Sequence, residues 1–201
     1  MQDGNESISP HIILYTLDMS VLLNGRRFTN MKSALQVANK IIENGKNQNP
    51  PQYYTPMQLL KLVYIAHGWM LALFNRPLFN EKVEAWKYGP VIPELYEAVK
   101  HHKANPVKEL IVNSDDAFDT QEQGVIDYVI NAYGHIDGIT LSQITHAPNT
   151  PWSMTYDHVD WGNEISNNLI TNHYKLLLDE LKNKAKQKKA ELEDTKNDAT
   201  C

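Results

Sequence analysis

Cysteine is almost absent from this chain: the one cysteine among 201 residues is Cys201, the last of them. A disulfide within the chain and a cysteine-ligated metal centre are therefore excluded. Three glycine motifs are absent as well, namely a phosphate-binding loop ending in Lys-Ser or Lys-Thr, the dinucleotide-binding pattern and the Gly-x-Ser-x-Gly elbow. The sequence nominates no catalytic nucleophile and no cofactor, and we expect no enzymatic activity.

An excess of positive charge is also absent, because 19 Lys and Arg face 24 Asp and Glu, for a net charge of −5. Coating a nucleic acid needs clustered Lys and Arg, so we do not expect a nucleic-acid partner. No two of the eight histidines stand at the i, i+4 spacing that places two rings on one metal ion. Asp115-Asp116 lies in a polar stretch typical of solvated turns rather than of a catalytic pair.

Length and composition predict one globular domain with added ends, since 42% of the residues are hydrophobic and 21% are charged. We expect an N-terminal extension (1–30), a helical domain (31–178) and a charged tail (179–201) that is either a helical extension or disordered. The opening MQDGNESISP lacks the basic-then-apolar order of a signal peptide, which predicts a cytoplasmic protein.

The stretch from Thr55 to Phe74, TPMQLLKLVYIAHGWMLALF, predicts a helix that is buried on most sides. Thr55 and Gln58 form a capping box at its start, and Pro56 occupies the first helical position, where its missing N–H costs nothing. Lys61 and His67 interrupt the apolar run too early for a membrane span of about 20 residues. We therefore expect the central helix of a soluble domain and no membrane partner.

The remaining segments predict a mainly α fold around this helix, with at most a short β hairpin or extended piece near 83–92. Tyr88-Gly89-Pro90 closes that extended piece as a turn. Capping boxes are predicted at Thr120 with Gln123 and at Thr140 with Gln143. The expected helices run from Met31 to about Gly45, Pro93 to about His102, Thr120 to about Tyr133, Thr140 to His146, around Ile165 to Ile170, and Tyr174 to Leu181.

An apolar run from His11 to Leu23 stands out in the N-terminal extension. Periodicity does not decide between strand and helix here. The run either covers a hydrophobic surface of the domain or docks on a partner.

Aromatic side chains with a polar tip indicate recognition, because Tyr and Trp anchor many protein interfaces. The alternative for each tryptophan is packing in the core. For His67, within the most apolar helix, the alternative is a hydrogen-bonded core histidine. The residues in question are Tyr53, Tyr54, Trp69, Trp86, Tyr88, Trp152 and Trp161.

Three stretches together resemble a known family: TPMQLLKLVYIAHGWMLAL (55–73), RPLFNEKVEAWKYGPVIPELYEAVK (76–100) and LSQITHAPNTPW (141–152). The family is that of the Panacea, or SocA-like, antitoxin domain, which also includes phage-associated members. The resemblance implies a compact, mostly helical domain without enzymatic activity or cofactor, which binds a protein toxin usually encoded by the adjacent gene.

The resemblance makes an antitoxin the leading interpretation. The alternative is a proteolytic adaptor for a host protease such as ClpXP, or a phage-encoded protein that binds a host protein. Autorepression through DNA is not expected, because no separate helix-turn-helix domain is visible. The residues that we predict to bind the partner are Glu84, Trp86, Tyr88, Gly89, Pro90, His67, His146 and Trp152.

Overall fold

The computed structural model describes residues 31–113, 117–158 and 162–198. The predicted N-terminal extension with its apolar run, Asp115-Asp116 and Trp161 lie outside the described residues. The described part is mainly α, as predicted, with seven α-helices, one 3-10 turn and one small sheet. In chain order the helices are α3 (Ala34–Lys46), α4 (Pro56–Phe74), α5 (Pro93–Val99), η1 (Lys100–His102), α6 (Thr120–Tyr133), α7 (Gly138–His146), α8 (Pro151–Thr155) and α9 (Asn167–Asp198).

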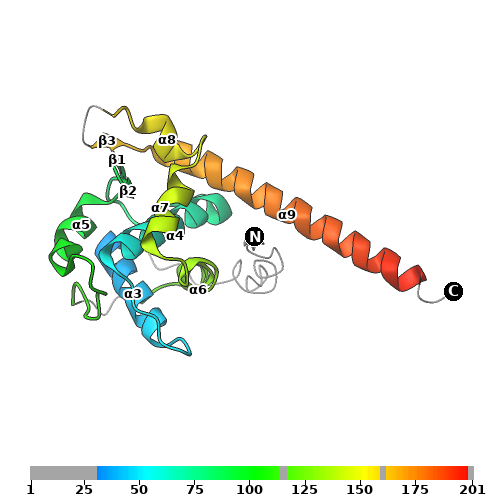
Figure 1. The fold of residues 1–201 in the computed structure, drawn as a ribbon, viewed down its shortest axis with the longest axis horizontal. Helices are drawn as coiled ribbons and strands as arrows, with labels where there is room; N and C mark the ends of the chain where they lie inside the picture. The colour runs from blue at the N-terminus through cyan, green and yellow to red at the C-terminus, as the bar shows by residue number, and fades with distance from the viewer. Residues whose placement is uncertain (1–30, 114–116, 159–161, 199–201) are drawn as a thin grey trace, which may run out of the picture.

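Helix α4 lies at the centre, with α3, α6, α7 and α9 packed around it (Figure 1). Its predicted start is confirmed: Thr55 accepts from the backbone N–H of Gln58, the Gln58 side chain reaches back to the N–H of Thr55, and Pro56 follows the cap. The helix ends at Asn75, whose left-handed backbone conformation lets its N–H bond to Leu71. Local capping therefore fixes both ends of the element on which the others pack.

The core is richest in aromatic rings where α4 meets α6 and α9. The Trp69 ring makes edge contacts with Tyr128 at 5.4 Å and with Tyr174 at 5.3 Å between centroids. Gly68 permits this approach, because a Cβ there would lie 2.2 Å from the Tyr174 ring. Helix α9 can lie this close to α4 only because residue 68 has no side chain.

Among the described residues, α4 is the one helix that is long and apolar enough to cross a membrane. Most of it, 78% of its most apolar window, is already buried inside the domain. Contacts with the other helices thus account for its hydrophobicity.

The sheet has the strand order β2-β1-β3, with β1 (Glu84–Trp86) paired antiparallel to both β2 (Gly89–Val91) and β3 (Asn163–Glu164). The β1–β2 pair is the expected hairpin, with Trp86 opposite Gly89. Strand β3 was not predicted, because its two residues pair with a strand that is far away in sequence. The hairpin lies against α4 and α7 and leads directly into α5.

Two predicted helix caps are wrong by a few residues. Asp119 caps α6 and forms a capping box with Glu122, so Thr120 is already helical. Asp137 caps α7 by accepting from two backbone N–H groups, which places Thr140 inside the helix. In both cases an aspartate just upstream is the acceptor, since a carboxylate caps at least as well as a hydroxyl.

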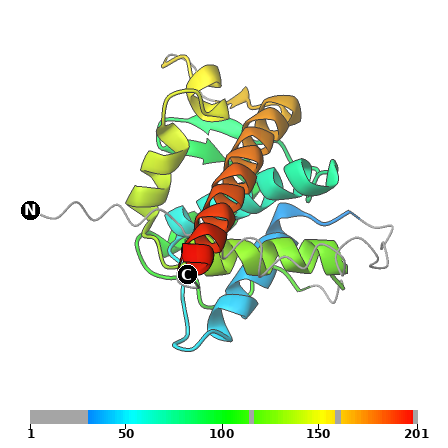
Figure 2. The same cartoon turned by 90° about the vertical axis from the view of Figure 1, so that its right-hand side faces the viewer.

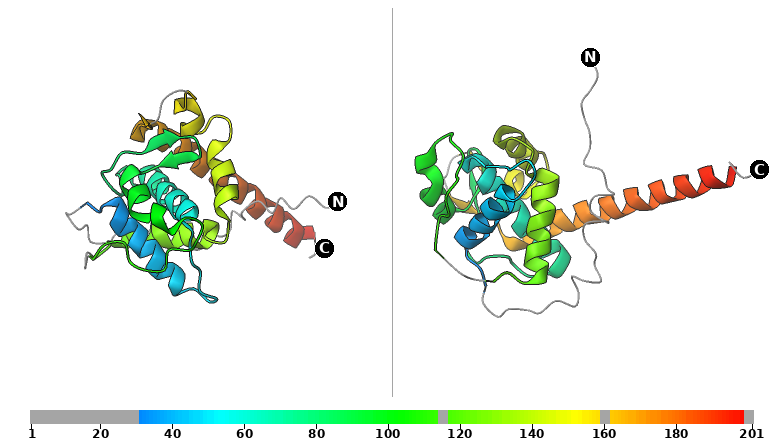
Figure 3. Two further views of the ribbon diagram at one scale, coloured as in Figure 1. Left: turned by 60° about the vertical axis from the view of Figure 1, so that its left-hand side comes forward. Right: turned by 90° about the horizontal axis from the view of Figure 1, so that it is seen from below.

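The C-terminal helices also differ from the prediction. Ile165 precedes α9, with its N–H bonded to the Val83 carbonyl, and α9 then runs unbroken from Asn167 to Asp198. No Gly or Pro stands between the two helices expected there, so nothing ends the first one. As far as Asp198 the tail is thus helical, and it projects past the domain (Figure 1 and Figure 3). Figure 2 views this helix almost along its axis. Helix α8, which contains Trp152, was not predicted, because Pro148 and Pro151 were interpreted as ending the preceding helix. Pro151 instead occupies the first position of α8, after the cap Thr150.

Candidate functional site

The tip of the β1–β2 hairpin is formed by Lys87 and Tyr88, and its return depends on Gly89. Gly89 has φ +104°, a conformation that L side chains rarely adopt. A Cβ there would also lie 2.8 Å from Lys61 Nζ and 3.1 Å from His146 Cε1. Glycine therefore allows the hairpin to turn and to rest directly on α4 and α7.

Lys61 supports the hairpin from below. It is the one residue of α4 with a formal charge, and only 2% of its surface is exposed. Its Nζ donates to the Pro90 carbonyl at 3.0 Å. Burial disfavours the ammonium form and lowers the pKa of Lys61 to about 7.

Helices α7 and α8 hold the other carbonyls of the hairpin. Ser142 Oγ donates to Tyr88 O at 3.0 Å, and His146 Nε2 lies 3.3 Å from Lys87 O. Trp152 Nε1 donates to Trp86 O at 2.8 Å, and its ring packs on His146 with centroids 3.8 Å apart. The carbonyls of residues 86, 87, 88 and 90 thus each have a side-chain partner from a helix distant in sequence.

Two aromatic side chains of the hairpin, those of Trp86 and Tyr88, are not part of these contacts. The Trp86 ring meets Tyr96 of α5 edge-on at 5.0 Å, and its Nε1 donates to Glu84 Oε2 at 2.8 Å. Tyr88 is 63% exposed, although its backbone is fixed. An exposed aromatic ring on a fixed backbone is suited to contact a partner, because little conformational entropy is lost on binding.

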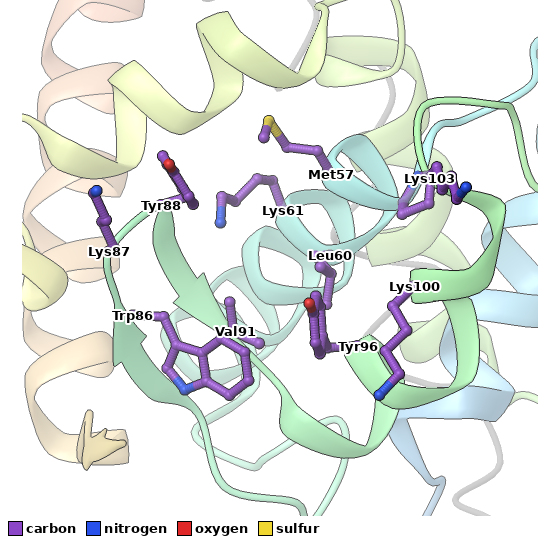
Figure 4. A pocket seen from close by; sticks show the side chains of 11 residues that line it. Met57, Leu60, Lys61, Trp86, Lys87, Tyr88, Val91, Tyr96, Lys100 and Lys103 are labelled. Carbon is purple, nitrogen blue, oxygen red and sulfur yellow. The ribbon is translucent and has the colours of Figure 1, made fainter. Parts of the chain in front are cut away.

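A pocket of about 340 Å³ opens between the hairpin, the first turns of α4, and α5 with η1 (Figure 4). Apolar and aromatic side chains form most of its wall, and lysines complete it. The lining residues are Pro56, Met57, Leu60, Lys61, Trp86, Lys87, Tyr88, Val91, Tyr96, Lys100 and Lys103.

The structure brings seven of the eight predicted partner-binding residues together at the hairpin: Glu84, Trp86, Tyr88, Gly89, Pro90, His146 and Trp152. His67 is placed elsewhere. It is 1% exposed and stacks near Phe79, with Nε2 2.9 Å from Asn167 Oδ1 and Nδ1 accepting from the Leu78 N–H at 3.4 Å. Burial lowers the pKa of His67 to about 4. His67 is therefore a hydrogen-bonded core histidine, the alternative that the sequence analysis gave for it.

Sequence reasoning missed Lys61, Ser142 and Tyr96 as parts of this site. Lys61 carried a usable signal, as a lone charge within the most apolar helix. Ser142 and Tyr96 carried none, because only the tertiary fold brings them to the hairpin. No group of three or more His, Cys, Asp or Glu side chains that could hold a metal ion occurs in the described part of the chain.

Comparison with known proteins identifies relatives of this domain. The family model "Antitoxin SocA-like, Panacea domain" matches residues 59–153, a range that contains Lys61, the hairpin, Ser142, His146 and Trp152. Antitoxin SocA of Caulobacter vibrioides (strain NA1000 / CB15N) is 30% identical over 133 residues, which cover 60% of this chain and 69% of that protein. No solved structure matches the chain.

Proposed function

This chain belongs to the SocA-like antitoxin family with a Panacea domain, and we propose that it neutralises a cognate protein toxin by binding it directly. The observation that carries the proposal is the similarity to Antitoxin SocA over most of that protein. The family match also contains the residues that hold the hairpin carbonyls, so the surface described above belongs to the shared domain.

We place the toxin-binding surface at the hairpin tip and the adjoining pocket. Tyr88 is the exposed aromatic anchor, and Trp86 and Tyr96 form a half-buried aromatic wall beside it. Hot spots of protein interfaces are typically Trp, Tyr and Arg in such partly enclosed positions. The hydrogen bonds from α4, α7 and α8 keep this surface in one conformation before the toxin arrives.

The proposed mode of action is binding rather than catalysis, and we place it in the cytoplasm. A stoichiometric inhibitor needs a complementary surface and no reactive group. The hairpin tip supplies such a surface, and its buried polar atoms are engaged in holding the fold.

The test is co-expression with the adjacent gene, scored as growth of cells in which that neighbour alone is toxic. We expect rescue and a stable complex on purification. A chain carrying Tyr88→Asp serves as the matched variant, because it alters an exposed side chain and leaves the backbone contacts in place. Toxicity that persists with the wild-type chain at equal expression would contradict the proposal.

Masking and delivery to a protease differ in the fate of the toxin. Masking leaves the toxin at full abundance in rescued cells, whereas an adaptor lowers it in a protease-dependent way. We propose masking, and a toxin that disappears only while a protease such as ClpXP is present would instead establish the adaptor alternative.

We also propose that residues 1–30 contribute to partner choice, because of the apolar run from His11 to Leu23. Removing them should abolish neutralisation while the helical circular dichroism of the remainder is kept. If the truncated chain fails to fold, residues 1–30 instead cover a hydrophobic surface of the domain.

A further inference from the structure

The pocket beside the hairpin has a charge opposite to that of the chain. Four of its lining residues are lysines, and among the described residues none of the lining is acidic. The whole chain nevertheless carries a net charge of −5. A basic pocket in an acidic protein selects a negatively charged ligand and steers its approach.

Lys61 provides the innermost of these charges and has no counter-ion among the described residues. An ammonium group has three N–H donors, and one of them bonds to Pro90 O. Within the described residues, no carboxylate lies within ion-pair distance of Lys61. Buried cations are normally paired, and burial lowers the pKa of this group.

The remaining wall requires an apolar group next to the anion. Met57, Leu60 and Val91 are aliphatic, and the Trp86 and Tyr96 rings close one side (Figure 4). A volume of about 340 Å³ is enough for one or two side chains and too small for a helix. The pocket therefore fits a short motif that combines a carboxylate with an apolar residue.

We propose that this pocket binds an acidic residue of the toxin together with a neighbouring aromatic or aliphatic residue, with the carboxylate on Lys61. The inference rests on the proposed function and names the chemistry of the partner. The apolar residue packs against Trp86 and Tyr96 under Tyr88. Lys87, Lys100 and Lys103 at the rim attract the acidic segment.

Other titratable groups lie on the elements around Lys61. Lys87 and Tyr88 lie on the hairpin, Lys100 and Lys103 follow α5, and His146 of α7 approaches through Gly89. Of the rim lysines, Lys100 is paired with Glu97, and Lys87 lies over the Tyr88 ring. Binding should therefore weaken as the pH rises above 7, where Lys61 loses its proton in the free chain.

Substitutions around the pocket test the inference in a pair that neutralises. Lys61→Met, Tyr88→Ala and Lys100→Glu should each weaken binding of the adjacent gene's product by roughly tenfold or more. Tyr53→Ala is the control for Tyr88, since Tyr53 is also exposed and also lies under a lysine. Lys182→Glu is the control for Lys100, since both are exposed lysines paired with an acid three residues earlier.

The outcomes separate the inference from the proposed function. Neutralisation by the wild type and the controls, but not by the pocket variants, supports both. Undiminished affinity of all three folded pocket variants overturns the inference alone. If the wild-type chain fails to neutralise, the proposed function falls and the inference falls with it.

The pKa of Lys61 distinguishes a residue that binds the toxin from one that only supports the fold, because complex formation should change the pKa only in the first case. It is measured by NMR on lysine labelled with 13C at Cε, in the free chain and in the complex, with Lys61→Met assigning the signal. We expect the pKa to rise from about 7 towards its ordinary range when a carboxylate binds. A pKa that stays or falls further on complex formation would show that no carboxylate reaches Lys61.

Discussion

The two halves of α4 each bury a titratable side chain, in different surroundings. His67 has a protein hydrogen-bond partner at each ring nitrogen and lies in the closed core. Lys61, almost two turns earlier, has one bond to the hairpin and lines an open pocket. The C-terminal half of this helix thus builds a closed interior and the N-terminal half an incomplete site, and the incompleteness is what points to a partner.

Substitutions in the C-terminal half of α4, which lies in the closed core, should lower the free energy of unfolding most. Gly68→Ala places a methyl group against the Tyr174 ring, and we expect it to destabilise the fold by about 3 kcal/mol. The measurement is the free energy of unfolding from urea titration. Gly124→Ala in α6 is the control, since Ala is favoured over Gly inside a helix by up to about 1 kcal/mol. Equal stability of the Gly68 variant and wild type would contradict the close contact between α4 and α9.

His67 should control stability on the acid side. Its pKa is about 4 in the folded chain and 6.5 in the unfolded chain, so only the unfolded state takes up a proton between these values. The resulting loss as the pH falls from 6.5 to 4 is about 3 kcal/mol. His67→Gln should flatten this part of the curve of unfolding free energy against pH. A variant with the wild-type slope would show that His67 is accessible to water.

Lys61 should control stability on the alkaline side, with the same sign: stability again rises with pH. Its pKa is about 7 folded and 10.5 unfolded, so the unfolded state holds the extra proton between these values. Stability should therefore increase by about 2 to 3 kcal/mol from pH 7 to 9. Comparing wild type with Lys61→Met removes the contribution of other groups. Parallel curves for the two proteins would contradict a buried Lys61.

The hairpin tip should matter least for folding. Tyr88→Ala removes an exposed ring, and we expect the unfolding free energy to change by less than about 0.5 kcal/mol. Circular dichroism and urea titration measure this effect. A larger loss would mean that Tyr88 supports the hairpin and would weaken its assignment as a contact residue.

The sequence is sufficient to predict elements that are defined by local chemistry. The capping box at Thr55, the following proline and the apolar run lie within one segment, and they identify α4 without tertiary information. Gly89 and Pro90 likewise predict the hairpin, although the turn itself is formed by Lys87 and Tyr88, and Gly89 and Pro90 already belong to β2. The caps of α6 and α7 were misplaced because a threonine and an aspartate compete for the same role within a few residues.

The site depends on contacts that no local pattern reveals. The Ser142 hydroxyl donates to the backbone carbonyl of Tyr88. Because every residue has a backbone carbonyl, the sequence does not indicate which one a side chain will bind. Strand β3 has two residues, too few for a detectable alternation. His67 was included among the partner-binding residues, yet it lies in the core, because an apolar helix does not reveal which of its polar residues faces a pocket.

Hydrogen exchange of the chain with and without the adjacent gene's product tests the central claim most directly. We predict that complex formation slows exchange in the segment from the hairpin tip through η1, residues 87–102, and leaves the core segment 62–73 of α4 unchanged. Slowed exchange confined to other surfaces, in a complex that still neutralises, would contradict the assignment of the hairpin and its pocket as the toxin-binding site.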